Sequence, residues 1–162
     1  AMRDPLTGLG NRRFVDENLE ELVQSARHTQ TDLVCITFDV DNFKQVNDTL
    51  GHAVGDELLI FIASLIQASV RGDDYPIRLG GDEFVLLMPG CDMDHATRIT
   101  GRMVVLFRQH VQMAFPQVPV SLSVGLASLA QDSPADGRGL MELADQRLYE
   151  AKRAGKDQLV SR

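Results

Sequence analysis

Two adjacent acids, Asp82 and Glu83, follow a pair of glycines, Gly80 and Gly81, between two apolar runs. This pattern predicts a β-hairpin with its tight turn at the two glycines, because a two-residue hairpin turn needs a positive φ at one or both central positions. Such a hairpin holds both carboxylates beside the turn, and the glycines leave room for a ligand to approach the backbone. Adjacent like charges favour a cation site, although a solvated polar turn would contain the same residue types.

Two further acids, Asp39 and Asp41, follow the apolar run 33–38, which is typical of a strand buried on both faces. Ligands of open sheets bind beyond the carboxyl ends of strands, and Mg²⁺ commonly lies between one or two carboxylates and the phosphates of a substrate. We expect only one of the two acids to face the hairpin acids and the other to point to the opposite side of the strand. We expect Asp39 to be the acid that faces the hairpin. The pattern predicts a divalent-metal site, against the simpler interpretation of solvated loop acids.

Polar residues beyond this strand have the chemistry of a nucleotide site. Backbone N–H groups of Asn42, Phe43 and Lys44 open a predicted short helix, and such groups bind phosphate. Lys44 adds a positive charge, although a surface lysine is its ordinary interpretation. Asn47 and Asp56 have the hydrogen-bonding groups to hold a guanine edge, but spacing alone does not assign them that role.

The elements that must position these residues follow from the apolar periodicity. It predicts helices at residues 12–29, 43–47, 56–70, 92–113 and 135–155. It predicts strands at 33–38, in both arms of the hairpin, at 118–129 and, as a short edge, at 158–160. Strands separated by helices, together with one hairpin, imply a mixed α/β or α+β sheet covered by helices.

The composition limits the classes of function. The 162 residues suit one domain, and the net charge of −7 disfavours nucleic acid and anionic membranes, although a divalent cation can bridge an acidic protein to a polyphosphate. The two cysteines, Cys35 and Cys91, form no CxxC motif, which argues against a disulfide framework or a zinc site. No run approaches about 18 apolar residues, so we expect no membrane contact and a cytoplasmic location. The start at Ala1 and Met2 suggests a cloning remnant and a domain excised from a longer multidomain protein.

Five separated segments together resemble the GGDEF domain of diguanylate cyclases. They are RDPLTGLGNRR (3–13), FDVDNFKQVNDTLGHAVGDELL (38–59), RLGGDEF (78–84), SLSVGLA (121–127) and DQRLYEAKRAGKD (145–157). The resemblance extends over nearly the whole chain and implies a single catalytic domain over residues 1–162. Its implied fold is α+β, a central, mostly antiparallel five-stranded sheet surrounded by helices, similar to nucleotide cyclases and polymerase palms. The implied reaction, carried out by a homodimer with Mg²⁺ or Mn²⁺, condenses two GTP into cyclic di-GMP and releases pyrophosphate.

The resemblance also implies roles for individual residues. Metal ligation falls to Asp39, the Val40 carbonyl, Asp82 and Glu83, and catalysis to Asp82, Glu83 and Lys44. GTP binding falls to Asn42, Phe43, Lys44, Asn47, His52, Asp56, Gly80, Gly81, Lys152 and Lys156. The sequence departs from the family where the usual Gly-Arg-Asn is Gly155-Lys156-Asp157. A lysine keeps the charge but loses the bidentate fork of arginine, and Asp157 adds a like charge near the phosphates. Helix-end cations are the simpler interpretation of both lysines.

Arg71 and Asp74 match the RxxD motif through which the family binds its product as an inhibitor. An arginine suits phosphate or guanine, and an aspartate suits a guanine edge. The alternative function is a catalytically weak GGDEF module that binds GTP or cyclic di-GMP as a regulatory receptor. Such modules usually lose hairpin acids, so the presence of both favours the enzyme.

Overall fold

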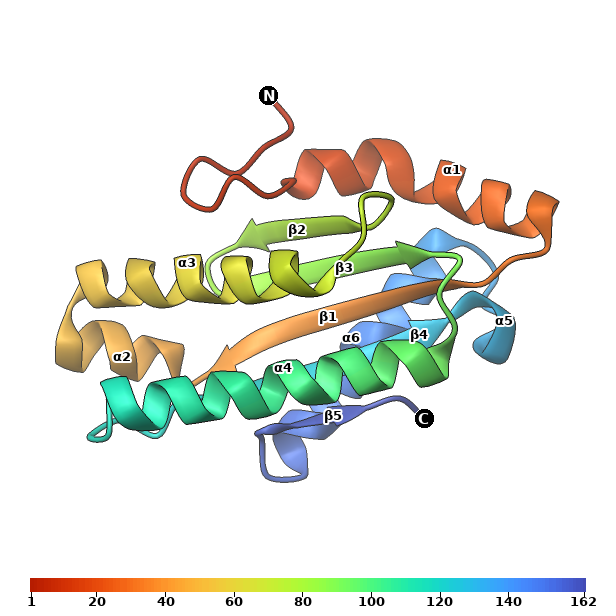
Figure 1. The fold of residues 1–162 in the computed structure, drawn as a ribbon. Helices are drawn as coiled ribbons and strands as arrows, with labels where there is room; N and C mark the ends of the chain where they lie inside the picture. The colour runs from red at the N-terminus through yellow and green to blue at the C-terminus, as the bar shows by residue number, and fades with distance from the viewer.

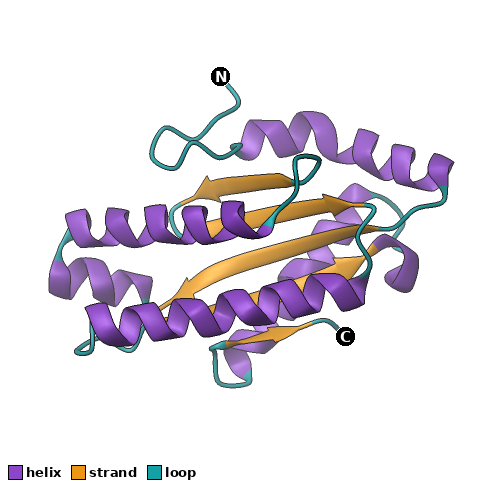
Figure 2. Ribbon diagram, in the orientation of Figure 1, coloured by secondary structure: helices purple, strands orange, loops and turns teal.

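The computed structural model describes residues 1–162 as a five-stranded sheet with helices on both faces (Figure 1, Figure 2). The strands are β1 (Leu33–Asp41), β2 (Tyr75–Gly80), β3 (Glu83–Pro89), β4 (Ser121–Ser128) and β5 (Gln158–Val160). Their order is β2-β3-β1-β4-β5, and only the β4–β5 pair is parallel. The predicted fold class, a mostly antiparallel sheet surrounded by helices, is confirmed.

The helices form two layers. They are α1 (Arg12–Thr29), α2 (Phe43–Leu50), α3 (His52–Ser69), α4 (Met93–Ala114), α5 (Leu129–Asp132) and α6 (Gly137–Arg153). Helices α3 and α4 pack on the near face of the sheet in Figure 1, and α1 and α6 pack on the other. Because side chains alternate along a strand, Ile36 and Phe38 join the core under α3 and α4, whereas Cys35 joins the core under α1 and α6.

The central strand β1 is longer than the apolar run predicted. It continues to Asp41, because β3 pairs with it as far as Asp39 and β4 pairs with it as far as Asp41. The two acids are therefore strand residues rather than residues of a loop after the strand. This places both carboxylates on a rigid element at the edge of the core.

The hairpin turn lies one residue later than predicted. Gly80 pairs with Glu83, so the turn residues are Gly81 and Asp82, and the register shifts between Arg78 and Gly80. Gly80 and Gly81 have φ values of 142° and 51°, which side-chain-bearing residues rarely adopt. The consequence is that Asp82 is itself a turn residue at the tip of the hairpin.

Helix α3 begins at His52, four residues before the predicted start at residue 56, and Gly55 lies inside it. This helix is long and apolar enough, by length and composition alone, to cross a membrane. Its side chains Leu58, Ile62 and Ile66 are instead buried in the core against the sheet, as in a core helix of a globular domain. The short helix α5 was not predicted.

Candidate active site

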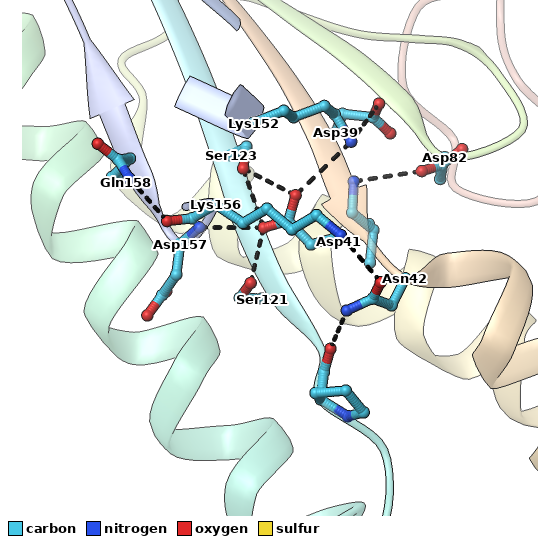
Figure 3. Close-up of polar contacts among 12 residues, drawn as sticks. Asp39, Asp41, Asn42, Asp82, Ser121, Ser123, Lys152, Lys156, Asp157 and Gln158 are labelled. Atoms are coloured by element: carbon cyan, nitrogen blue, oxygen red, sulfur yellow. Dashed lines mark hydrogen bonds and ion pairs between the residues drawn. The ribbon is translucent and has the colours of Figure 1, made fainter. Parts of the chain in front are cut away.

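The tip of the hairpin meets the end of β1. The carboxylate of Asp82 accepts a hydrogen bond from the backbone N–H of Val40, at 3.2 Å (Figure 3). Asp39 of β1 is the cross-strand partner of Glu83 in β3. Glu83 is exposed, whereas Asp39 and Asp82 are half-buried. The structure thus brings together the acids that the sequence placed 43 positions apart, Asp39 and Asp82.

Asp39 and Asp41 lie on the same face of β1, so the expectation that they face opposite sides is wrong. Side chains two residues apart in a strand share a face, and Lys152 Nζ lies 3.0 Å from Asp39 and 3.6 Å from Asp41 (Figure 3). Their surroundings separate them. Asp41 is fully buried and accepts hydrogen bonds from the hydroxyls of Ser121 and Ser123, whereas the buried Oδ1 atom of Asp39 has no partner.

These charges perturb one another. Burial and the neighbouring Asp82 raise the pKa of Asp39 to about 7, although Lys152 acts in the opposite direction. Burial alone would lower the pKa of Lys152, but Asp39, Asp41 and Asp82 outweigh it and raise the pKa. The site therefore holds more negative charge than one lysine offsets, and it favours an additional cation.

The donor atoms of the site fit Mg²⁺ or Mn²⁺. Asp39 and Asp82 offer carboxylate oxygens, one of them buried without a partner, and hard cations prefer oxygen ligands. No three His, Cys, Asp or Glu side chains converge closely enough to hold a metal ion by themselves. Further ligands would have to come from backbone oxygens, such as the Val40 carbonyl, from water or from a substrate. Sites for metal–nucleotide complexes commonly have this composition.

The start of α2 lies beside the acids. Asn42 precedes the helix in a left-handed conformation, with φ of 63°, and its side chain makes no capping hydrogen bond. Its amide donates instead to the Pro119 carbonyl and accepts a hydrogen bond of 3.1 Å from Lys156 Nζ. The first N–H groups of α2, from Phe43 onward, therefore lack a side-chain cap, and Lys44 is exposed next to them.

The residues expected to hold a base lie where α2 meets α3. Gly55 of α3 is so close to α2 that a Cβ atom there would lie 2.0 Å from Asn47 Oδ1. Asp56 and His52 are exposed in the first turns of α3. The two helices thus place Asn47 and Asp56 around the same interhelical contact, at the end of the sheet where the acids lie (Figure 1).

Lys156 and Asp157 connect α6 to β5, and both have left-handed backbone conformations, with φ of 65° and 53°. The Asp157 carboxylate does not face the acids. It turns toward α4 and forms an ion pair of 2.6 Å with Arg108. Sequence reasoning missed Arg108, because it lies 49 residues from its partner and belongs to no motif.

Arg71 and Asp74 lie apart from these residues, before the start of β2, whereas Asp82 follows its end. Asp74 accepts a hydrogen bond of 2.9 Å from the Arg71 backbone N–H, and its buried Oδ1 atom has no hydrogen-bond partner. Burial raises the pKa of Asp74. The Arg71 side chain is 54% exposed and could contact a ligand.

Asp145 of α6, a further acid that was not predicted, faces the edge of the sheet that carries Asp39 and Glu83. It lines an open pocket of about 280 Å³ together with Arg12, Asp39, Glu83 and Lys152. Burial, followed by the charge of Glu83, raises the pKa of Asp145. The pocket continues the site along the α1 and α6 face of the sheet.

The Arg78 side chain binds the hairpin turn and the N-terminal turn. Its guanidinium donates two hydrogen bonds, of 3.0 and 2.8 Å, to the Gly81 carbonyl, and one of 3.0 Å to Asp4. Sequence reasoning had no reason to pair residues 74 positions apart. Arg78 therefore connects the N-terminal turn to the loop that carries Asp82.

Residues 1–158 match the family model described as "Diguanylate cyclase, GGDEF domain". The chain is 36% identical over 159 residues to the diguanylate cyclase DgcP of Pseudomonas aeruginosa, and 38% identical over 157 residues to the diguanylate cyclase DgcS of Shewanella oneidensis. These matches cover 98% and 97% of the chain, which spans 24% of the length of the first protein and 51% of the second.

Solved structures give the same result. The GGDEF domain of DgcB from Caulobacter crescentus, in complex with c-di-GMP, superposes with a TM-score of 0.87 at 27% identity and covers 99% of this chain and 95% of that chain. The GGDEF domain of PA1120 from Pseudomonas aeruginosa superposes with a TM-score of 0.86 at 34% identity, over 98% of this chain and 93% of that chain.

Proposed function

The chain belongs to the diguanylate cyclase GGDEF domain family, and from this premise we propose that it condenses two GTP molecules into cyclic di-GMP and releases pyrophosphate. The observation that carries the proposal is the meeting of Asp39 and Asp82 at one edge of the sheet, where a buried carboxylate oxygen lacks a partner. The hairpin retains both of its acids, Asp82 and Glu83, which favours the enzyme over the receptor function.

The divalent cation, when bound, would neutralise charge on the attacking and leaving oxygens. Asp39, the Val40 carbonyl, Asp82 and Glu83 would hold it. The protein supplies the rest of the site by binding and orienting GTP. The uncapped N–H groups from Phe43 onward bind the terminal phosphates, and the lysines offset their charge. Asn47 and Asp56, with His52 nearby, bind guanine, and Gly80 and Gly81 allow the substrate to approach the hairpin.

In each half-reaction the 3′-oxygen of one GTP forms a bond to the α-phosphorus of the other. The bond between that phosphorus and pyrophosphate breaks, and the 3′-hydroxyl proton leaves to Glu83 or to solvent. The reverse attack closes the ring. Positioning and electrostatics account for most of the acceleration.

A homodimer follows from the chemistry, because one domain offers one base site and one phosphate site. Two domains that face each other bring each 3′-hydroxyl to the other nucleotide. Because the chain spans only part of the length of its relatives, we further propose that it is one catalytic domain, cytoplasmic like its substrate, of a longer protein that controls this pairing.

Arg71 and Asp74 constitute a separate candidate site for the product. Arg71 is exposed, whereas the Asp74 side chain is fully buried, with Arg71 Nη2 3.8 Å from the Oδ1 atom that has no hydrogen-bond partner. The Arg71 guanidinium suits a phosphate of cyclic di-GMP, and Asp74 suits its guanine edge once the Arg71 side chain turns to the ligand and uncovers the carboxylate. Product bound there would restrain the enzyme from a distance.

The test is product chromatography after incubation with GTP and Mg²⁺. The domain is fused to a dimeric coiled coil so that pairing does not limit turnover. We expect cyclic di-GMP from the wild type and from the control Asp16→Asn, an exposed acid of α1, but none from Asp82→Asn. Product from Asp82→Asn would contradict the assigned role of Asp82. GTP binding without product in the wild type would favour the receptor function.

A further inference from the structure

We infer that Arg108 is a positioning residue of the phosphate site, which acts through Asp157 to hold Lys156 beside the start of α2. The inference rests on the proposed function, because it concerns the binding of GTP at that site. It extends the site to α4, a helix that contributes none of the residues assigned so far.

Arg108 and Asp157 form a short ion pair. Arg108 Nε lies 2.6 Å from Asp157 Oδ2, and both side chains are about one-third exposed, at 35% and 32%. Figure 3 shows the Asp157 side chain extending away from the acids and toward α4. A charge-assisted contact of this length in a partly buried setting is stronger than an exposed surface pair.

The backbone of Asp157 is also held by a tertiary contact. Its N–H donates to the carboxylate of the buried Asp41, at 3.1 Å, so the residue is held by β1 through its backbone and by α4 through its side chain. Lys156 and Asp157 both have positive φ, which residues with a Cβ adopt less readily than glycine. The loop is also held by hydrogen bonds from the Lys156 backbone N–H to the Ala151 carbonyl and from the Gln158 amide to the Lys156 carbonyl. The ion pair with Arg108 is the contact that joins this loop to α4.

The conformation of this loop sets the position of Lys156. The loop conformation places Lys156 Nζ 3.1 Å from Asn42 Oδ1, at the residue that precedes α2 (Figure 3). The charge of Lys156 thus lies beside the uncapped N–H groups proposed to bind phosphate. If the loop relaxed, this long and exposed side chain would lose its fixed position.

The negative charge of Asp157 is paired with Arg108. An aspartate next to a triphosphate site would repel the substrate, and Asp157 stands where the family pattern has asparagine. Arg108 neutralises that charge and draws it to α4. The arginine is therefore needed because residue 157 is acidic, which makes the two positions energetically coupled.

A competing explanation is that Arg108 itself contacts phosphate, since it also lines an open pocket of about 440 Å³ together with Lys156 and Asn42. The two explanations differ in one respect. Direct contact requires the arginine whatever occupies position 157, whereas positioning through Asp157 makes the arginine dispensable once the acid is removed.

The experiment is a double-mutant cycle in the dimerised domain, with KM and kcat measured for GTP. We expect Arg108→Ala to raise KM roughly five- to tenfold with kcat changed less than about twofold, because binding rather than chemistry loses support. Asp157→Asn alone is expected to raise KM less than Arg108→Ala does, because the loop loses the ion pair but the acid that repels phosphate is lost with it. The double variant should have a KM within about twofold of Asp157→Asn and below that of Arg108→Ala. Arg108→Lys should recover part of the loss, because a lysine keeps the charge without the guanidinium geometry.

The matched control is Arg138→Ala, which removes an arginine from an exposed ion pair with Glu142 on α6. An unchanged KM in Arg108→Ala, or a double variant no better than Arg108→Ala, overturns the inference. If the wild type binds GTP but makes no product, the proposed function fails. The dissociation constant for GTP in the presence of Mg²⁺, measured for the same four proteins, then tests the inference in place of KM. A wild type that binds no GTP overturns both.

Discussion

The ammonium group of Lys152 lies 3.0 Å from the carboxylate of Asp39, so a lysine of α6 supplies a counter-charge to the central strand. The same group lies 3.6 Å from the fully buried Asp41. Lys152 therefore belongs to the acidic cluster as well as to the proposed phosphate site. Its contacts with the two acids predict an effect on stability.

The first prediction concerns stability. Lys152→Met should lower the free energy of unfolding by about 1–3 kcal/mol, because the buried acids lose their counter-ion. Urea denaturation in EDTA measures the loss, and Mg²⁺ should recover part of it by replacing the charge. Lys44→Met is the control, since Lys44 is exposed and makes no ion pair. Equal losses for the two variants would refute this role of Lys152.

The second prediction concerns pH. The pKa of Asp39 is raised from 3.8 to about 7, so the folded protein retains a proton that the unfolded chain releases. Stability in EDTA should therefore fall as pH rises from 4 to 7. A cation competes with that proton, so Mg²⁺ affinity should rise about tenfold between pH 6 and pH 8. Calorimetric titration at both pH values measures it, and Asp39→Asn should abolish the dependence. Equal affinity at both pH values would contradict the prediction.

The third prediction concerns the support of the hairpin. Arg78→Ala should lower the free energy of unfolding by about 2–4 kcal/mol, because the buried Asp4 loses its ion-pair partner and the Gly81 carbonyl loses two hydrogen bonds. Despite burial, hydrogen bonds from Thr7 and the charge of Arg78 lower the pKa of Asp4. That contribution to stability is present above the pKa of the unfolded chain and is lost as pH falls through the pKa of the folded protein. The free energy of unfolding should therefore fall less on acidification in the variant than in the wild type.

The control for Arg78 is Arg13→Ala, whose partner Glu17 lies on the surface of α1. Exposed ion pairs contribute less than about 1 kcal/mol, so the free energy of unfolding of Arg13→Ala should barely differ from that of the wild type. Urea denaturation of both variants at pH 4 and pH 7 measures the difference. A cost for Arg78→Ala no larger than that for Arg13→Ala would show that the ion pair with Asp4 carries no special weight.

The fourth prediction concerns guanine binding. Gly55→Ala should displace Asn47, because the new Cβ would lie 2.0 Å from Asn47 Oδ1, the movable end of a side chain. Stability should change little, since alanine favours the helix by up to about 1 kcal/mol. The KM for GTP should rise several-fold. In an Asn47→Ala background the same change should have almost no effect, and a persistent effect there would point to another cause.

The fifth prediction concerns the packing of α6 on β4. A Cβ at Gly125 would lie 2.0 Å from the Ala144 carbonyl and 2.3 Å from the Leu148 backbone nitrogen, neither of which can rotate away. Gly125→Ala should therefore lower the free energy of unfolding by more than about 3 kcal/mol. Gly139→Ala is the control, because its nearest atoms are 3.5 Å away and the change favours a helix. Thermal unfolding compares them, and a small effect at Gly125 would mean that α6 shifts freely.

Much of the fold could be predicted because its patterns are local. The amphipathic spacing of α1 and α6 repeats within a few residues, and the apolar run that begins β1 is continuous. The boundaries that were wrong depend on partners elsewhere. β1 continues through Asp39 because β3 and β4 pair with it, and the hairpin turn shifts because Gly80 pairs with Glu83.

The sequence by itself determined the family, since five spaced motifs and their acids, glycines and lysines are visible in chain order. Only the tertiary structure decided which charges meet. The contacts of Lys152 with Asp39, of Arg78 with Asp4 and of Arg108 with Asp157 join residues far apart in the chain. The apolar periodicity of the sequence predicts local elements and cannot predict such pairs, because the packing of helices on the sheet brings the partners together and sets their distances.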